Sequence, residues 1–118
     1  MKGEIREMHH VSIDDLKEFA TDKRIRKKVA GSEKIVAEMV CYTPGQVTPN
    51  HVHPKQDEIF YVVEGHGAMI VDEEEIPVRP KSVIFVPARV SHGVKAAEDS
   101  NLVLMFFKVP GSTIKKKE

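Results

Sequence analysis

Cysteine is almost absent from this chain, whose 118 residues include one cysteine, Cys41, and no tryptophan. A single cysteine cannot form a disulfide within the chain, and it is typical of a protein from a reducing cytosol. Long apolar runs are also missing, since the longest is residues 102–107 and the amino terminus carries no apolar signal region. We therefore expect a cytoplasmic protein that neither crosses a membrane nor is secreted by an ordinary signal.

An excess of charge of either sign is missing too. Lysine plus arginine and aspartate plus glutamate each number 18, so the formal net charge is zero. This balance gives no reason to expect a nucleic-acid or membrane partner, and we interpret the lysines at 115–117 as part of a solvated tail. Charged residues nevertheless make up 31% of the chain, with few asparagines and glutamines, which hints at a thermophilic source.

The length predicts one domain over residues 1–118, with a core at about 25–110 and a flexible tail at 111–118. Ser12 is a candidate cap for a short helix over 13–21, where apolar residues follow at helical spacing. Short segments of strand character, separated by turn residues, follow at 25–30, 34–43, 47–53, 57–64, 67–72, 75–79, 83–87, 91–96 and 101–109. Many short strands with one N-terminal helix indicate an all-β antiparallel barrel or sandwich.

Two histidines and a glutamate stand close together between Gly45 and Gly65. His51 and His53 are separated by one residue, so on a strand both side chains point to the same face. Glu58 follows a turn marked by proline and can return to the same point from the next strand. Imidazole nitrogens and carboxylate oxygens are ligands that divalent transition metals prefer. The stretch therefore predicts a metal site, and the alternative is a pair of surface histidines beside a hairpin.

The spacing of these residues resembles the first conserved motif of the cupin superfamily: glycine, five residues, His-x-His, four residues, Glu, six residues, glycine. Residues 80–92 resemble the second motif, with Pro87 and His92 at the family spacing. Lys81 and Arg89 stand where the family has glycines, and an alanine at position 96 replaces the usual asparagine. Because these glycines serve turns that favour φ > 0, the turn geometry at both positions is in question.

The resemblance implies a small antiparallel β-barrel of the double-stranded β-helix, or jelly-roll, type. It also implies one divalent transition metal ion (Fe, Mn, Ni, Cu, Co or Zn) with four protein ligands: His51, His53, Glu58 and His92. Small single-domain cupins commonly pair, so the resemblance also favours a homodimer. The remaining histidines at 9, 10 and 66 are interpreted as solvent-exposed.

Strand alternation predicts which side chains face the inside of the barrel. In 34–42 the wholly apolar set is Ile35, Ala37, Met39 and Cys41, which we assign to the interior. In the last strand Lys108 should face water, so that Val103, Met105 and Phe107 point inward. With Phe60 and Val62 on the face of Glu58, these assignments predict a pocket wall: Met39, Cys41, Phe60, Met105 and Phe107. Ordinary barrel core is the alternative for these residues.

Two further expectations concern individual side chains. Cys41 is expected to be a buried, inert thiol, since every nearby histidine is accounted for as a metal ligand and none is left to act as its base. Ile59, Tyr61 and Val63 fall on the outer face and are too apolar for full exposure. Either a second layer of the barrel or a subunit partner should cover them.

Four protein ligands would leave up to two positions open on an octahedral ion, as in catalytic metal sites. The leading hypothesis is a metal-dependent enzyme, of dioxygenase type, acting on a small substrate with two adjacent oxygen donors. The family resemblance covers dioxygenases, decarboxylases and isomerases, and the sequence identifies no catalytic residues. The alternative is a non-catalytic module that binds a sugar or an organic acid through the same metal. A third possibility keeps the fold without a metal, although no ligand position has been lost.

Overall fold

The computed structural model describes residues 8–109. Over this range, helix α1 (Ile13–Leu16) precedes nine strands: β1 (Ile25–Gly31), β2 (Val36–Tyr42), β3 (Val47–His51), β4 (Glu58–Gly65), β5 (Gly67–Val71), β6 (Glu74–Val78), β7 (Val83–Val86), β8 (His92–Ala96) and β9 (Leu102–Lys108). Each predicted strand is present, with ends within two residues of the predicted bounds. The predicted tail at 111–118 lies outside the described residues. In the described part of the chain, no helix is long and apolar enough to cross a membrane.

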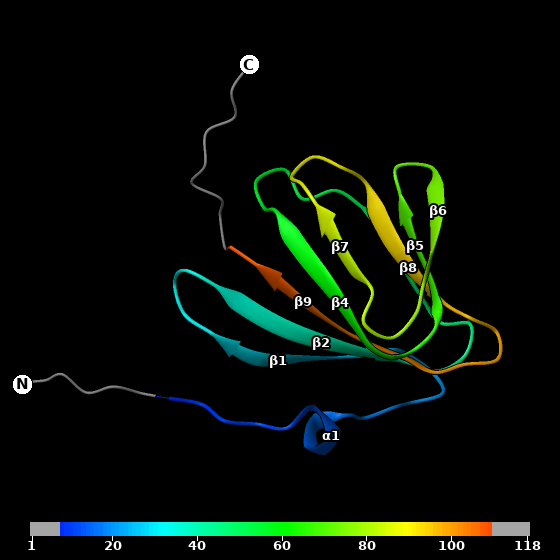
Figure 1. Ribbon diagram of the computed structural model, residues 1–118, viewed down its shortest axis with the longest axis horizontal. Coiled ribbons are helices and arrows are strands. Elements are labelled where there is room, and N and C mark those ends of the chain that lie inside the picture. The colour runs from blue at the N-terminus through cyan, green and yellow to red at the C-terminus, as the bar shows by residue number, and fades with distance from the viewer. Residues whose placement is uncertain (1–7, 110–118) are drawn as a thin grey trace, which may run out of the picture.

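The strands form two antiparallel sheets, ordered β1-β2-β9-β4-β7 and β3-β8-β5-β6. Figure 1 shows the two sheets and the N-terminal segment, which crosses the face of the larger sheet that points away from the smaller one. β9 lies between β2 and β4, so the end of the described chain is paired at the centre of the larger sheet. The prediction of an all-β fold of the jelly-roll type with one short helix is confirmed.

The main core fills the space between the two sheets. Its buried members are apolar side chains from both sheets: Val40, Tyr42, Phe60, Val62, Met69, Val78, Val86, Val94, Ala96, Leu102, Leu104 and Phe106. On β2 and β9 these residues all have even numbers, because alternate residues of a strand share one face. Phe60 and Val62 of β4 face the same interior, as predicted.

A second apolar cluster lies on the opposite face of the larger sheet. Met39, Cys41 and Val103 are fully buried there, although they point away from the smaller sheet. They are covered by the N-terminal segment, which places Ile13, Leu16 and Phe19 against them; Val29, Val63 and Met105 complete the cluster. The chain itself thus supplies part of the second layer that the apolar outer residues of β4 were predicted to need.

The prediction of the interior face of β2 and β9 was wrong. Met39 and Cys41 of β2 lie on the outer face, and so do Met105 and Phe107 of β9, the register partners of Met39 and Ala37. Ile35 precedes β2 and is 53% exposed. Alternation could not reveal this, because the N-terminal segment makes the outer face as apolar as the inner one.

The predicted helix over 13–21 was too long. Helix α1 ends at Leu16, and Lys17 already has extended backbone angles, φ −56° and ψ 139°. Past this point the chain has no regular structure until β1, and Phe19 still reaches the outer cluster. Ion pairs join this segment to the sheet, with Lys17 Nζ 2.8 Å from Glu64 Oε1 and Lys27 Nζ 2.8 Å from a carboxylate oxygen of Glu18. A helix this short gains little from its own hydrogen bonds, so packing on the sheet determines where it ends.

Candidate metal centre

Two of the predicted ligands are direct partners in the β3–β8 ladder. His51 is the last residue of β3, and His92 is the first residue of β8 and lies opposite it. His53 comes two residues after the end of β3, and Glu58 is the first residue of β4. The four residues therefore come from the ends of three strands, which bring the two motifs together.

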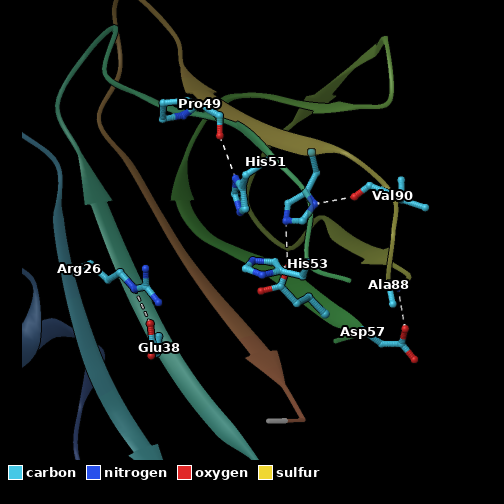
Figure 2. Close-up of polar contacts among 10 residues, drawn as sticks. Arg26, Glu38, Pro49, His51, His53, Asp57, Ala88 and Val90 are labelled. Carbon is cyan, nitrogen blue, oxygen red and sulfur yellow. Dashed lines mark hydrogen bonds and ion pairs between the residues drawn. The ribbon is translucent and has the colours of Figure 1, made fainter. Parts of the chain in front are cut away.

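The turn before β8 holds the segment that carries His53. The backbone N–H of Arg89 donates to the carbonyl of His53 at 2.9 Å, and the backbone N–H of Ala88 donates to Asp57 Oδ1 at 2.8 Å. Figure 2 shows the second of these contacts beside the histidines. The second motif thus fixes the backbone of the first as well as contributing His92.

The two positions where the family has glycine keep the left-handed backbone without it. Arg89 has φ 74° and Lys81 has φ 76°, and each turn is closed by an i to i+3 backbone hydrogen bond, Val90 N–H to Pro87 O at 3.3 Å and Ser82 N–H to Arg79 O at 2.9 Å. A φ > 0 at the third position is a feature of a type II turn, and the turn that contains Lys81 also has the proline that this turn favours at its second position. The turns are therefore retained at these two substitutions.

The three histidines form a compact cluster. His51, His53 and His92 each offer a ring nitrogen, and these atoms lie within 4.8 Å of one another. Nδ1 of His51 lies 2.9 Å from the carbonyl of Pro49, and Nδ1 of His92 lies 3.0 Å from the carbonyl of Val90 (Figure 2). Because a carbonyl only accepts, each Nδ1 carries the proton, and in the neutral ring Nε2 keeps its lone pair for a metal.

Glu58 completes the cluster at its buried side. Its Oε1 lies 2.9 Å from Nε2 of His92 and 3.7 Å from Nε2 of His53. Glu58 is 3% exposed and His92 is 2% exposed, yet neither Oε1 nor Nε2 of His92 has a hydrogen-bond partner of acceptable geometry. Two lone pairs that face each other in a buried site need a positive charge between or upon them. These residues therefore fit a metal cation.

The pKa shifts of this pair have the same cause. Burial raises the pKa of Glu58, but the imidazoles of His92 and His53 lower it more, so the net shift is downward. Burial lowers the pKa of His92, while the contacts with Glu58 and the carbonyl of Val90 raise it more, so the net shift is upward. A proton on His92 thus supplies the positive charge that a metal ion would supply.

The cluster opens into a pocket of about 370 Å³ between the two sheets. Of the predicted wall, Phe60 lines this pocket, whereas Met39, Cys41, Met105 and Phe107 do not. The lining residues are Arg24, Arg26, Val40, Tyr42, Thr48, Pro49, Asn50, His51, His53, Glu58, Phe60, His92, Val94, Leu104, Phe106 and Lys108. Because the wrong faces of β2 and β9 were predicted to point inward, the predicted wall omitted Val40, Leu104, Phe106 and Lys108.

Lys108 faces the pocket, contrary to the prediction. It is the register partner of Glu58 in the β4–β9 ladder, so the two side chains share the inner face. The register of β4 against β9 is a long-range feature that the sequence alone did not reveal. Because Lys108 pairs with the inward-facing Glu58, Leu104 and Phe106, which alternate with it along β9, also face inward.

Two other side chains have their roles clarified. Cys41 is 1% exposed, and burial raises the pKa of its thiol, which supports the prediction of a buried thiol. Tyr42 lies in the wall of the pocket with its hydroxyl 2.8 Å from Thr48 Oγ1, and burial raises its pKa to about 12.

His9, His10 and His66 are exposed and stand apart from the cluster, as predicted.

Comparison with known proteins gives consistent results. A family model described as "Cupin domain" matches residues 38–108. The crystal structure of TT1209 from Thermus thermophilus is similar at 29% identity with a TM-score of 0.82, over 87% of this chain and 98% of that one. The structure of KdgF from a Halomonas species is similar at 30% identity with a TM-score of 0.68, over 74% of this chain and 79% of that one.

Curated relatives match over a shorter stretch. The protein SCO3923 from Streptomyces coelicolor is 39% identical over 57 residues, which are 48% of this chain and 54% of that protein. The chain spans between 41% and 54% of the length of the curated relatives that it matches.

Proposed function

The chain belongs to the cupin domain family, and on this basis we propose that it is a metal-dependent enzyme acting on a small molecule with two adjacent oxygen donors. The observation that carries the proposal is the unpartnered pair of buried atoms, Glu58 Oε1 and His92 Nε2, within the cluster of three histidines. His51, His53, Glu58 and His92 would hold one divalent transition metal ion. When bound, that ion supplies Lewis acidity, or one-electron chemistry with O₂ if it is redox-active.

The protein side chains prepare the site in three ways. The carbonyls of Pro49 and Val90 hold two imidazoles with Nε2 turned to the cluster. Phe60 and Phe106, whose ring centres are 5.5 Å apart, form an apolar wall that limits water around the reacting groups. The open end of the pocket admits a small molecule, whose two oxygen donors would face the histidines.

Metal content tests the ligand assignment. Elemental analysis of protein purified without tag or chelator is expected to find close to one transition metal ion per chain, and His53→Ala and His92→Ala should each remove it. His66→Ala is the matched control, because His66 is exposed and pairs with Asp99 at 3.3 Å away from the cluster. Retention of metal by both site variants would overturn the assignment.

The reaction type is proposed on chemical grounds. A site with three histidines, one carboxylate and open positions suits dioxygenase-type chemistry if iron, manganese, copper, nickel or cobalt is found. Oxygen consumption by metal-loaded protein with candidate diols and 2-oxo acids would test this. A protein that contains only zinc, or that turns over none of these compounds, would contradict the oxygenase proposal.

A non-catalytic binding module is the second candidate, and one observation favours it. Among the described residues that line the pocket, Glu58 is the only carboxylate, and it faces the histidine cluster. Tyr42, with a pKa of about 12, is a poor proton-transfer group near neutral pH. Saturable ligand binding without conversion, measured by calorimetry and product analysis, would favour this module.

We also propose that the chain forms a homodimer through the outer face of β4 and β7. Ile59 is 44% exposed and Phe85 is 57% exposed, and the two are direct partners across the strands; Val83 beside them is 64% exposed. Contiguous apolar exposure of this kind is typical of a protein interface. Sedimentation should give twice the mass of the chain, and Phe85→Glu should shift it to the monomer. A monomeric wild-type protein would contradict the proposal.

A further inference from the structure

We propose that the pocket is selective for small organic anions, with Lys108 and Arg26 holding a carboxylate of the ligand while its other oxygen atoms face the histidine cluster. This inference rests on the proposed function, because it names the ligand class of the same site. It narrows the two candidates that the sequence left open for a binding module, sugar and organic acid, to the acid.

Lys108 places a positive charge next to the metal cluster. Its Cα is paired with that of Glu58 in the β4–β9 ladder, so both side chains project from the same face into the pocket. Within residues 8–109, no carboxylate lies within ion-pair distance of its Nζ, which instead lies 5.5 Å from the centre of the Phe106 ring. The ammonium group is therefore positioned at the ligand space without a protein anion to neutralise it.

Arg26 places a second cation over the same ring. Its Cζ lies 5.5 Å from the centre of Phe106, and its Nε donates to Glu38 Oε1 at 2.5 Å. Figure 2 shows the Arg26–Glu38 pair on the larger sheet, across from the histidines. Glu38 engages Nε and so holds the guanidinium in place, which leaves the Nη groups for a ligand. A planar guanidinium suits a carboxylate better than a hydroxyl group.

The distances in the pocket fit a ligand of a few carbon atoms. The Phe60 ring centre lies 5.6 Å from that of His92 and 5.5 Å from that of Phe106, and both cations lie over Phe106. Two neighbouring aromatic rings thus connect the cationic end of the pocket to the histidine cluster. A ligand that lies along Phe60 and Phe106 reaches both ends.

The charge balance favours an anion over a neutral ligand. Three cations line the pocket, Arg24, Arg26 and Lys108, whereas Glu58 is the one carboxylate among the described lining residues; Glu38, which does not line the pocket, pairs with Arg26. Three neutral histidines and one carboxylate would leave a divalent ion with a net charge of +1. A neutral sugar would leave this excess unpaired in a partly buried site, whereas a carboxylate compensates for it.

A matched pair of ligands tests the proposal. L-malate carries two carboxylates, and butane-1,2,4-triol is the same carbon skeleton with both reduced to alcohols. Calorimetry is performed with each compound on protein whose metal content has been measured, and on the same protein after removal of metal. Malate is expected to bind at least about tenfold more tightly than the triol, with an affinity that falls as salt is added.

Charge-removing variants connect the selectivity to the named residues. Arg26→Gln combined with Lys108→Gln should weaken malate binding about tenfold or more while leaving metal content unchanged. Lys108→Gln alone should give a smaller loss and serves if the double variant folds poorly. Lys95→Gln is the control for overall charge, because Lys95 is an exposed residue of β8 and does not line the pocket; it should change nothing.

The outcomes separate this inference from the proposed function. Equal affinity for malate and the triol, no detectable malate binding, or full affinity in the double variant would each overturn the anion selectivity. Loss of metal in His53→Ala and His92→Ala supports the ligand assignment and does not test the anion selectivity. If the chain holds no metal but malate still binds through Lys108 and Arg26, the proposed enzyme fails while the anion pocket stands.

Discussion

Replacing Arg89 or Lys81 with glycine is expected to stabilise the protein. Both residues are held at φ near 75°, in turns that backbone hydrogen bonds close. An L-residue in the left-handed region costs about 1–2 kcal/mol, which glycine avoids. Glycine also has greater freedom in the unfolded chain, which lowers the free energy of unfolding by about 0.5–1 kcal/mol. The expected gain in the free energy of unfolding is therefore roughly 0.5–1 kcal/mol at each site.

The two turns are separate and share no hydrogen bond, so the gains should add in the double variant to about 1–2 kcal/mol. Urea denaturation should show a higher midpoint with an unchanged slope, and the melting temperature should rise by several degrees. Arg89→Gly keeps the backbone donor to His53, so metal content should not change.

Alanine variants provide the control for this prediction. Arg89→Ala and Lys81→Ala remove the same side-chain charge as glycine but keep the Cβ that makes the left-handed region costly. They should leave stability within about 0.5 kcal/mol of the wild type. If alanine stabilises as much as glycine, or if glycine destabilises, the reasoning from backbone strain is refuted.

Three further predictions concern the site and its support. As pH falls, metal affinity should begin to weaken at a pH above the ordinary imidazole pKa of about 6.5. The reason is that burial lowers the pKa of His92, but its contacts with Glu58 and the carbonyl of Val90 raise it more. Calorimetric titration with Ni²⁺ at several pH values measures this, and an affinity that is constant down to about pH 6 would contradict it. Gly93→Ala should destabilise the fold by about 1–3 kcal/mol in urea, because a Cβ there would lie 2.1 Å from Asn50 Oδ1 and 2.8 Å from the backbone carbonyl oxygen of Thr48, both on β3. Wild-type stability would contradict the close packing of β3 on β8. Leu16→Ala should loosen the N-terminal segment and speed the reaction of Cys41 with a thiol reagent, since that segment covers the thiol; an unchanged labelling rate would show that another part of the chain protects it.

The fold and three of the four clustered residues could be predicted from the sequence because their signals are local. Turn residues separate each short strand from the next, so the strand ends were found within two residues. The interval from His51 to Glu58 spans one turn, and strand geometry alone brings these side chains together. His92 required the second motif, because only long-range strand pairing places it opposite His51.

The faces of the larger sheet could not be predicted in this way. Met39 and Val40 are adjacent and both are buried, one under the N-terminal segment and one between the sheets. When both faces of a strand are apolar, alternation carries no information about which is inside. The prediction therefore depended on Lys108, which was expected to face water. Because Lys108 lines the pocket instead, the inner and outer faces of β9 were exchanged.

The pairing of His51 with His92 across β3 and β8 has a consequence for how the protein matures. A slip of one residue between these strands would turn one imidazole to the far side of the smaller sheet. A chain in the wrong register could therefore not capture the ion, and metal uptake would report that the smaller sheet has paired correctly. With Co²⁺, whose colour depends on its coordination, refolding could be timed by the appearance of the bound-ion spectrum without attaching any probe.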